Sequence, residues 1–151
     1  MINKYSNRLQ KLEPFPKWDG KDFEKLPVLA KVRVKCTTDQ ISPAGAWLMY
    51  RGHLDRISDN LLLGAVNACH NGKVGNGMNV LNDNIESYPH IANNNKKGNL
   101  KWIILADKNY GDGSSREHAA MSPRYLGCAA VIARSFARIH KPILTNKECQ
   151  H

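Results

Sequence analysis

The chain has 151 residues and a formal charge of +9. This length is enough for one domain with a sizeable apolar core. No apolar run approaches the length that spans a bilayer, so we expect no membrane association. The positive charge favours anionic partners, but the lysines are scattered and no RNA- or DNA-binding motif is present, so we do not expect nucleic-acid binding.

In chain order, residues 1–26 are rich in proline, tryptophan and charge, and we expect an extended lead-in that packs through Phe15 and Trp18. Residues 28–36 alternate, with Ala30, Val32 and Val34 on one face, which predicts a half-buried strand. Residues 37–45 are predicted to form a polar loop.

After the short apolar run 47–51, Ser58 or Asp59 is predicted to cap a helix through residues 61–66. Residues 71–99 are rich in Asn, Gly and Lys, and predict a long surface excursion that is partly disordered or wrapped on a partner.

Residues 102–106 and 129–133 each predict a buried strand. Between them, Ser122 and Pro123 are expected to restart a helix, and residues 135–140 to begin another helical turn. The order strand, loop, helix, strand favours an α/β or α+β core.

The four cysteines are widely spaced and include no C-x-x-C pair: Cys36, Cys69, Cys128 and Cys149. A disulfide scaffold is not expected, and we predict no metal site within this chain, because such sites usually show close ligand pairs. Cys36 and Cys128 lie beside apolar strands and are predicted to be small buried thiols.

The most informative segment is GDGSSREHAA, residues 111–120, directly behind a predicted strand. Ser114 and Glu117 stand at capping-box spacing, so the helix would open at Ser114. Arg116 adds a cationic fork, while Gly111 and Gly113 permit positive φ. Together these features predict an anion site; the alternative is a capping box that only starts a helix. The segment matches no P-loop, dinucleotide fingerprint or G-x-S-x-G elbow.

Several motifs together resemble the last, mobile "swivel" domain of mitochondrial-type aconitases: SNRLQKLEPFPKWDGKDFEKL, KCTTDQISPAG, YRGHLD, and GDGSSREHAAMSPRYLG followed by SFARIH. The likeness runs from about Ser6 to His140, and the small subunit of isopropylmalate isomerase is a weaker match. The resemblance implies an α/β, aconitase-like swivelling β/β/α barrel domain. Such a domain closes over a [4Fe-4S] cluster that other domains hold, and the family interconverts citrate and isocitrate through cis-aconitate.

The resemblance also implies residue roles. Ser114 matches the family's proton-abstracting base, Ser115 and Arg116 match ligands of a substrate carboxylate, Arg51 matches another such ligand, and Asp39 belongs to the polar active-site shell. A serine is a poor base unless its alkoxide is stabilised, which a helix N-terminus and Arg116 would do.

Taken from the residues alone, Arg51 would form a surface ion pair with Asp55 four residues on, and Asp39 could equally be a turn-capping aspartate. We interpret His53 and His118 as hydrogen-bonded structural histidines.

The sequence departs from the family pattern at two places. Gln40 stands where the family has histidine, and residues 141–151 replace a long family segment, so we expect a C-terminally incomplete domain. We divide the chain into an interdomain lead-in (1–26), the swivel domain (27–140) and a divergent tail (141–151).

The first functional hypothesis is an enzyme part that needs cluster-bearing aconitase domains and acts on citrate, cis-aconitate and isocitrate, with no turnover on its own. The second is a non-catalytic truncated fragment, and the third a polycarboxylate- or RNA-binding module. The resemblance places the chain in mitochondria, although its first dozen residues lack the serine richness and amphipathic stripe of a transit peptide.

Overall fold

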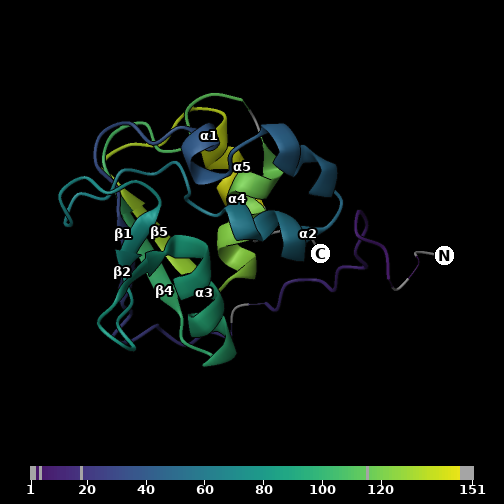
Figure 1. The fold of residues 1–151 in the computed structure, drawn as a ribbon, viewed down its shortest axis with the longest axis horizontal. Helices are drawn as coiled ribbons and strands as arrows, with labels where there is room; N and C mark the ends of the chain where they lie inside the picture. Colours follow the sequence, from purple (N-terminus) through teal and green to yellow (C-terminus); the bar gives the residue numbers. More distant parts are fainter. Residues whose placement is uncertain (1–2, 4, 18, 115, 147–151) are drawn as a thin grey trace.

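A computed structural model describes residues 3, 5–17, 19–114 and 116–146 (Figure 1). Its main sheet has three parallel strands, β1 (Val28–Lys31), β4 (Trp102–Ala106) and β5 (Cys128–Ala133), in the order β1-β4-β5. The predicted α/β class is confirmed, because a parallel sheet joined by a helical crossover forms the core.

The central strand β4 carries the best-buried side chains of the sheet. Trp102 and Ile104 are fully buried, and the Trp102 indole Nε1 donates a hydrogen bond to the Leu126 carbonyl at 3.0 Å. The only hydrogen-bond donor of the indole is therefore paired inside the core.

Helices pack against the sheet and against one another (Figure 1). The helix α4 (Glu117–Tyr125) lies between β5 and α2 (Leu54–Ile57), and α3 (Tyr88–Lys97) packs on β1. The remaining elements are α1 (Thr38–Ile41), α5 (His140–Asn146), the 3₁₀ helices η1 (Gly45–Tyr50) and η2 (Ser58–Asn60), and the antiparallel strands β2 (Asn76–Met78) and β3 (Ile85–Ser87). No helix in the described part of the chain is long and apolar enough to cross a membrane.

The strand predicted over 28–36 is shorter than expected. Ala30 and Val32 are buried, but Val34 is 62% exposed and has a φ of +65°, so the alternation ends before it. A left-handed residue breaks the extended backbone on which a period of two depends.

The helix predicted over 61–66 is wrong. The helix forms earlier, as α2, where the His53 side chain caps it, and residues 61–64 form turns. Leu61 and Leu62 are both fully buried, and Leu62 has a φ of +55°. The leucines therefore fill the core from a turn and not from one helical face.

The prediction of a partly disordered excursion over 71–99 is also wrong. This segment forms β2, β3 and α3. Along α3 the residues Tyr88, Ile91, Ala92 and Asn95 are buried, which is the spacing of one helix face. Asparagine-rich composition concealed this stripe.

In the C-terminal third, Pro123 lies inside α4 and does not restart a helix, and α5 begins only at His140. Both predicted strands are present, although β5 is only partly buried.

The described residues of the lead-in belong to none of the named helices or strands, and they run along the outside of the domain (Figure 1). Phe15 packs beneath the Arg124 guanidinium, whose carbon lies 4.8 Å from the ring centroid. Nearer the N-terminus, the Gln10 amide donates to the Gly52 carbonyl at 2.9 Å. Trp18 lies outside the described residues.

Candidate active site at the carboxyl ends of the sheet

Two loops that follow parallel strands meet at the same edge of the sheet. The loop after β1 and the loop after β4 are joined by hydrogen bonds from the Gly111 amide to the Cys36 carbonyl (2.8 Å) and from the Thr38 amide to the Asp112 carbonyl (2.9 Å). An ion pair between Lys35 and Asp112 ties them further. The carboxyl edge of a parallel sheet is where α/β proteins usually bind ligands.

Arg116 and Asp39 come from these two loops and form an ion pair, with 2.6 Å between Nη1 and Oδ1. The same Nη1 donates to the Ser42 carbonyl at 3.0 Å, and only 16% of the arginine side chain is exposed. Both contacts use Nη1, so the edge of the guanidinium formed by Nε and Nη2 makes no hydrogen bond to a described residue. The structure therefore brings these two predicted site residues together.

Asp39 does not cap the turn, because a different residue does so. The Thr37 hydroxyl accepts from the Gln40 amide at 3.3 Å, and the Gln40 side-chain oxygen accepts from the Thr37 amide at 2.9 Å. This is a reciprocal capping box at the start of α1. The glutamine that departs from the family pattern thus has a structural role that the sequence analysis missed, although T-x-x-Q spacing could have revealed it.

The capping box predicted for Ser114 and Glu117 is wrong. The helix α4 begins at Glu117, and Arg116 is its N-cap, with an extended backbone (φ −107°, ψ 115°) and no side-chain cap. Tertiary contacts explain this difference: the Arg116 side chain reaches across to Asp39 and the Ser42 carbonyl, and these contacts keep Arg116 out of the helix. Ser114 is exposed in the loop before it.

The two glycines of this loop behave as predicted: Gly111 has a φ of +82° and Gly113 a φ of +112°. Ser115 lies outside the described residues.

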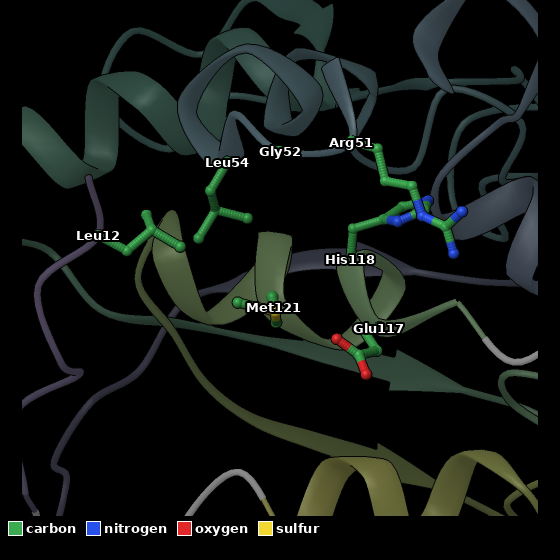
Figure 2. A pocket seen from close by; sticks show the side chains of 7 residues that line it. All are labelled: Leu12, Arg51, Gly52, Leu54, Glu117, His118 and Met121. Atoms are coloured by element: carbon green, nitrogen blue, oxygen red, sulfur yellow. The ribbon is translucent and has the colours of Figure 1, made fainter. Parts of the chain in front are cut away.

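Arg51 follows η1 and lines a pocket of about 250 Å³ (Figure 2). The other lining residues are Leu12, Gly52, Leu54, Glu117, His118 and Met121. Arg51 is exposed, and none of the ion pairs among the described residues joins it to Asp55. Asp55 accepts a hydrogen bond from the Tyr125 hydroxyl at 3.0 Å, so the expected surface pair is not formed.

His118 shares this pocket with Arg51, on the first turn of α4. Burial lowers the pKa of its imidazole, and the positive charges of Arg116 and Arg51 lower it further. Its Nε2 is buried and has no hydrogen-bond partner in the described part of the chain. The prediction of a hydrogen-bonded structural histidine is therefore wrong for this nitrogen. For His53 it is confirmed, because Nδ1 accepts from the Arg56 amide at 3.3 Å.

The described residues do not fit a metal centre. No group of three or more His, Cys, Asp or Glu among them is placed to hold a metal ion. Burial raises the pKa of the Cys36 and Cys128 thiols to about 12, so neither is a ready thiolate ligand. Cys36 is the fully buried thiol that was predicted; Cys128 as a residue keeps part of its surface exposed, although its thiol is buried enough for the pKa to rise.

Comparison with known proteins assigns this arrangement to a family. Residues 26–149 match the family described as "Aconitase C-terminal domain". The chain is 55% identical over 140 residues to the mitochondrial aconitate hydratase of Gracilaria gracilis and 52% identical over 141 residues to the probable mitochondrial aconitate hydratase of Dictyostelium discoideum.

These matches cover 93% of this chain but 18% of each relative, so the chain spans about a fifth of their length. Among solved structures, the 3-isopropylmalate dehydratase (leuD) of Methanocaldococcus jannaschii matches with a TM-score of 0.46 and 26% identity, over 76% of this chain and 52% of that one. With its family model matched over most of its length, the chain belongs to the aconitase C-terminal domain family.

Proposed function

We propose that this chain is the swivel domain of an aconitate hydratase, acting with cluster-bearing domains on citrate, cis-aconitate and isocitrate. The observation that carries the proposal is the junction of the two loops, where the Asp39–Arg116 ion pair lies beside the loop that contains Ser114. We take residues 27–140 as the swivel domain, 1–26 as the interdomain lead-in and 141–151 as a divergent tail.

In this proposal Ser114 takes a proton from the substrate carbon and returns one during hydration. Its exposed position suits contact with a substrate that enters from outside the domain. Arg116, with Nη1 committed to Asp39 and Ser42, would present Nε and Nη2 to a carboxylate as a two-pronged grip. Arg51 would bind a second carboxylate and Ser115 would assist. The cationic charge stabilises the serine alkoxide and the negative charge that develops on the substrate.

The family resemblance implies a [4Fe-4S] cluster, but the described residues do not fit one. We place the cluster on other domains of the full-length protein, and we place that protein in mitochondria because the relatives above are named mitochondrial. The contribution of this chain is then the base and the carboxylate-binding arginines.

A hybrid enzyme tests the proposal. The 140 residues that align with the Gracilaria gracilis enzyme would replace the matching segment of that enzyme, and cis-aconitate hydration would be measured. We expect an active hybrid in which Ser114→Ala lowers kcat by about 100- to 10,000-fold, the usual contribution of a general base, and in which Arg51→Gln raises KM. A hybrid that holds its cluster and keeps full activity with Ser114→Ala would overturn the assignment of the base.

A further inference from the structure

His118 carries a buried polar atom that the structure leaves unsatisfied. The residue is only 6% exposed, and its Nε2 has no hydrogen-bond partner among the described residues. Buried polar atoms are hydrogen-bonded in the great majority of cases, so an unpaired one at a pocket wall calls for an explanation.

The surroundings of His118 are cationic on two sides. Arg116 precedes it by two residues, and Arg51 reaches the same pocket from the end of η1. Figure 2 shows the imidazole and the Arg51 guanidinium extending toward the same side of the pocket, away from Leu54.

Burial and both guanidiniums oppose protonation of the ring, whereas Glu117 favours it. Asp39, on α1, is paired with Arg116 and offsets part of that arginine's charge. The balance leaves a neutral imidazole, which has one N–H donor and one acceptor nitrogen.

We propose that His118 is the positioning residue for Arg51. Its unprotonated Nε2 accepts a hydrogen bond from the Arg51 guanidinium when the arginine turns toward a bound carboxylate, and this bond holds the guanidinium in its binding orientation. An arginine has five donors and no acceptor, so a neutral histidine is a suitable partner and an imidazolium is not. His118 itself does not touch the substrate. The carboxylate part of this inference rests on the proposed function, but the pairing of the two side chains does not.

The pairing needs a neutral His118 ring with an unprotonated Nε2 close to Arg51, and these two requirements are tested without ligand. Long-range ¹H–¹⁵N spectra of the full chain, recorded at about pH 7 where an ordinary histidine is mostly neutral, should show His118 as the Nδ1–H tautomer with Nε2 unprotonated. Arg51→Gln should raise the pKa of His118, because it removes a nearby positive charge. A protonated ring, an Nε2–H tautomer, or a pKa that Arg51→Gln leaves unchanged would overturn the proposal.

The effect on binding is tested by titrating the chain with tricarballylate. We expect His118→Ala to weaken binding about tenfold, the loss of roughly one charge-assisted hydrogen bond. His118→Gln places an amide oxygen near the position of Nε2 and should bind within about threefold of wild type. The Arg51 Nε–H signal should sharpen on binding in wild type and His118→Gln but not in His118→Ala. His90→Ala, whose side chain is 60% exposed on α3, is the control and should bind as wild type does.

A merely structural role would lower the melting temperature of both His118 variants without separating their affinities. Tight binding by a folded His118→Ala variant would overturn the proposal, as would equal losses in both variants. A wild-type chain that does not bind tricarballylate would count against the proposed function, while the ring tautomer and the Arg51→Gln measurement would still test whether His118 has the ring state and the proximity to Arg51 that the pairing requires.

Discussion

At Gly111 the chain needs both a left-handed backbone and the absence of a side chain. Its φ is +82°, and a Cβ there would overlap the His140 ring. We predict that Gly111→Ala lowers the free energy of unfolding by about 2–4 kcal/mol, from φ strain plus overpacking. Urea unfolding measures this change.

Gly45→Ala is the matched control for this prediction. Gly45 has a φ of +70°, and a Cβ there would have no neighbour within 4 Å, so only the strain of about 1–2 kcal/mol should appear. Equal losses in the two variants would show that the His140 contact is unimportant.

His140 should make stability depend on pH. It is 1% exposed, both ring nitrogens lack hydrogen-bond partners among the described residues, and burial lowers its pKa below the ordinary 6.5. Below pH 6.5 the unfolded chain takes up a proton that the folded chain resists, so stability falls as the pH drops through that range.

The free energy of unfolding, measured at about pH 7.5 and 5.5, on either side of this titration, should therefore fall with pH. It should fall less in His140→Gln than in wild type. The exposed His90→Gln should keep the wild-type slope, and an unchanged slope in His140→Gln would contradict the prediction.

At the scale of elements, α1 depends on its capping box. Gln40→Ala removes the acceptor for the Thr37 amide, and we expect a loss of about 0.3–1.5 kcal/mol in thermal unfolding. Gln40→Glu keeps an acceptor at the same place and should be near wild type. A similar loss in Gln40→Glu would mean that the hydrogen bond contributes nothing. Since α1 also carries Asp39, its fraying would loosen the ion pair with Arg116.

The lead-in is held by a close backbone approach at Gly52. A Cβ there would lie 2.8 Å from the Leu9 Cδ2 atom and 3.0 Å from the Arg8 carbonyl oxygen. We predict that Gly52→Ala separates the lead-in and speeds amide exchange of Gln10 by about tenfold or more, as local opening costs less free energy. Gly98→Ala, where the nearest atom would be 3.6 Å away, should leave that exchange unchanged. Slow exchange in Gly52→Ala would contradict the prediction.

For the whole molecule, we expect no cis-aconitate hydration by the purified 151-residue chain, even after treatment with iron and sulfide. The chain spans 18% of its relatives, and the described residues offer no cluster site. Coupled spectrophotometry would check this, with Ser114→Ala as the background. Activity in wild type above that background would contradict the prediction.

Particular residues and elements show how much of the fold and of the site could be predicted from the sequence. The strand at 102–106 is predictable because a short run of large apolar residues bounded by polar loops is typical of a strand buried in the core. The site loop was predicted because Gly111 and Gly113 favour a turn that needs positive φ. Asparagine-rich composition conceals the apolar face of the helix that begins at Tyr88, so the sequence does not predict this helix. The buried leucines near Leu62 suggest a helix because their apolar run has no turn signal, although the backbone there forms a turn.

By itself, the sequence determined the α/β class, the glycine loop after a buried strand and, through its motifs, the family. These depend on local composition and short-range spacing. Only the tertiary structure decided that Arg116 pairs with Asp39 and opens α4, that Gln40 is a cap, and that His118 and Arg51 share a pocket. Those contacts join residues far apart in the chain, and the free energy of such a contact depends on the burial and charges that the packed fold creates around it.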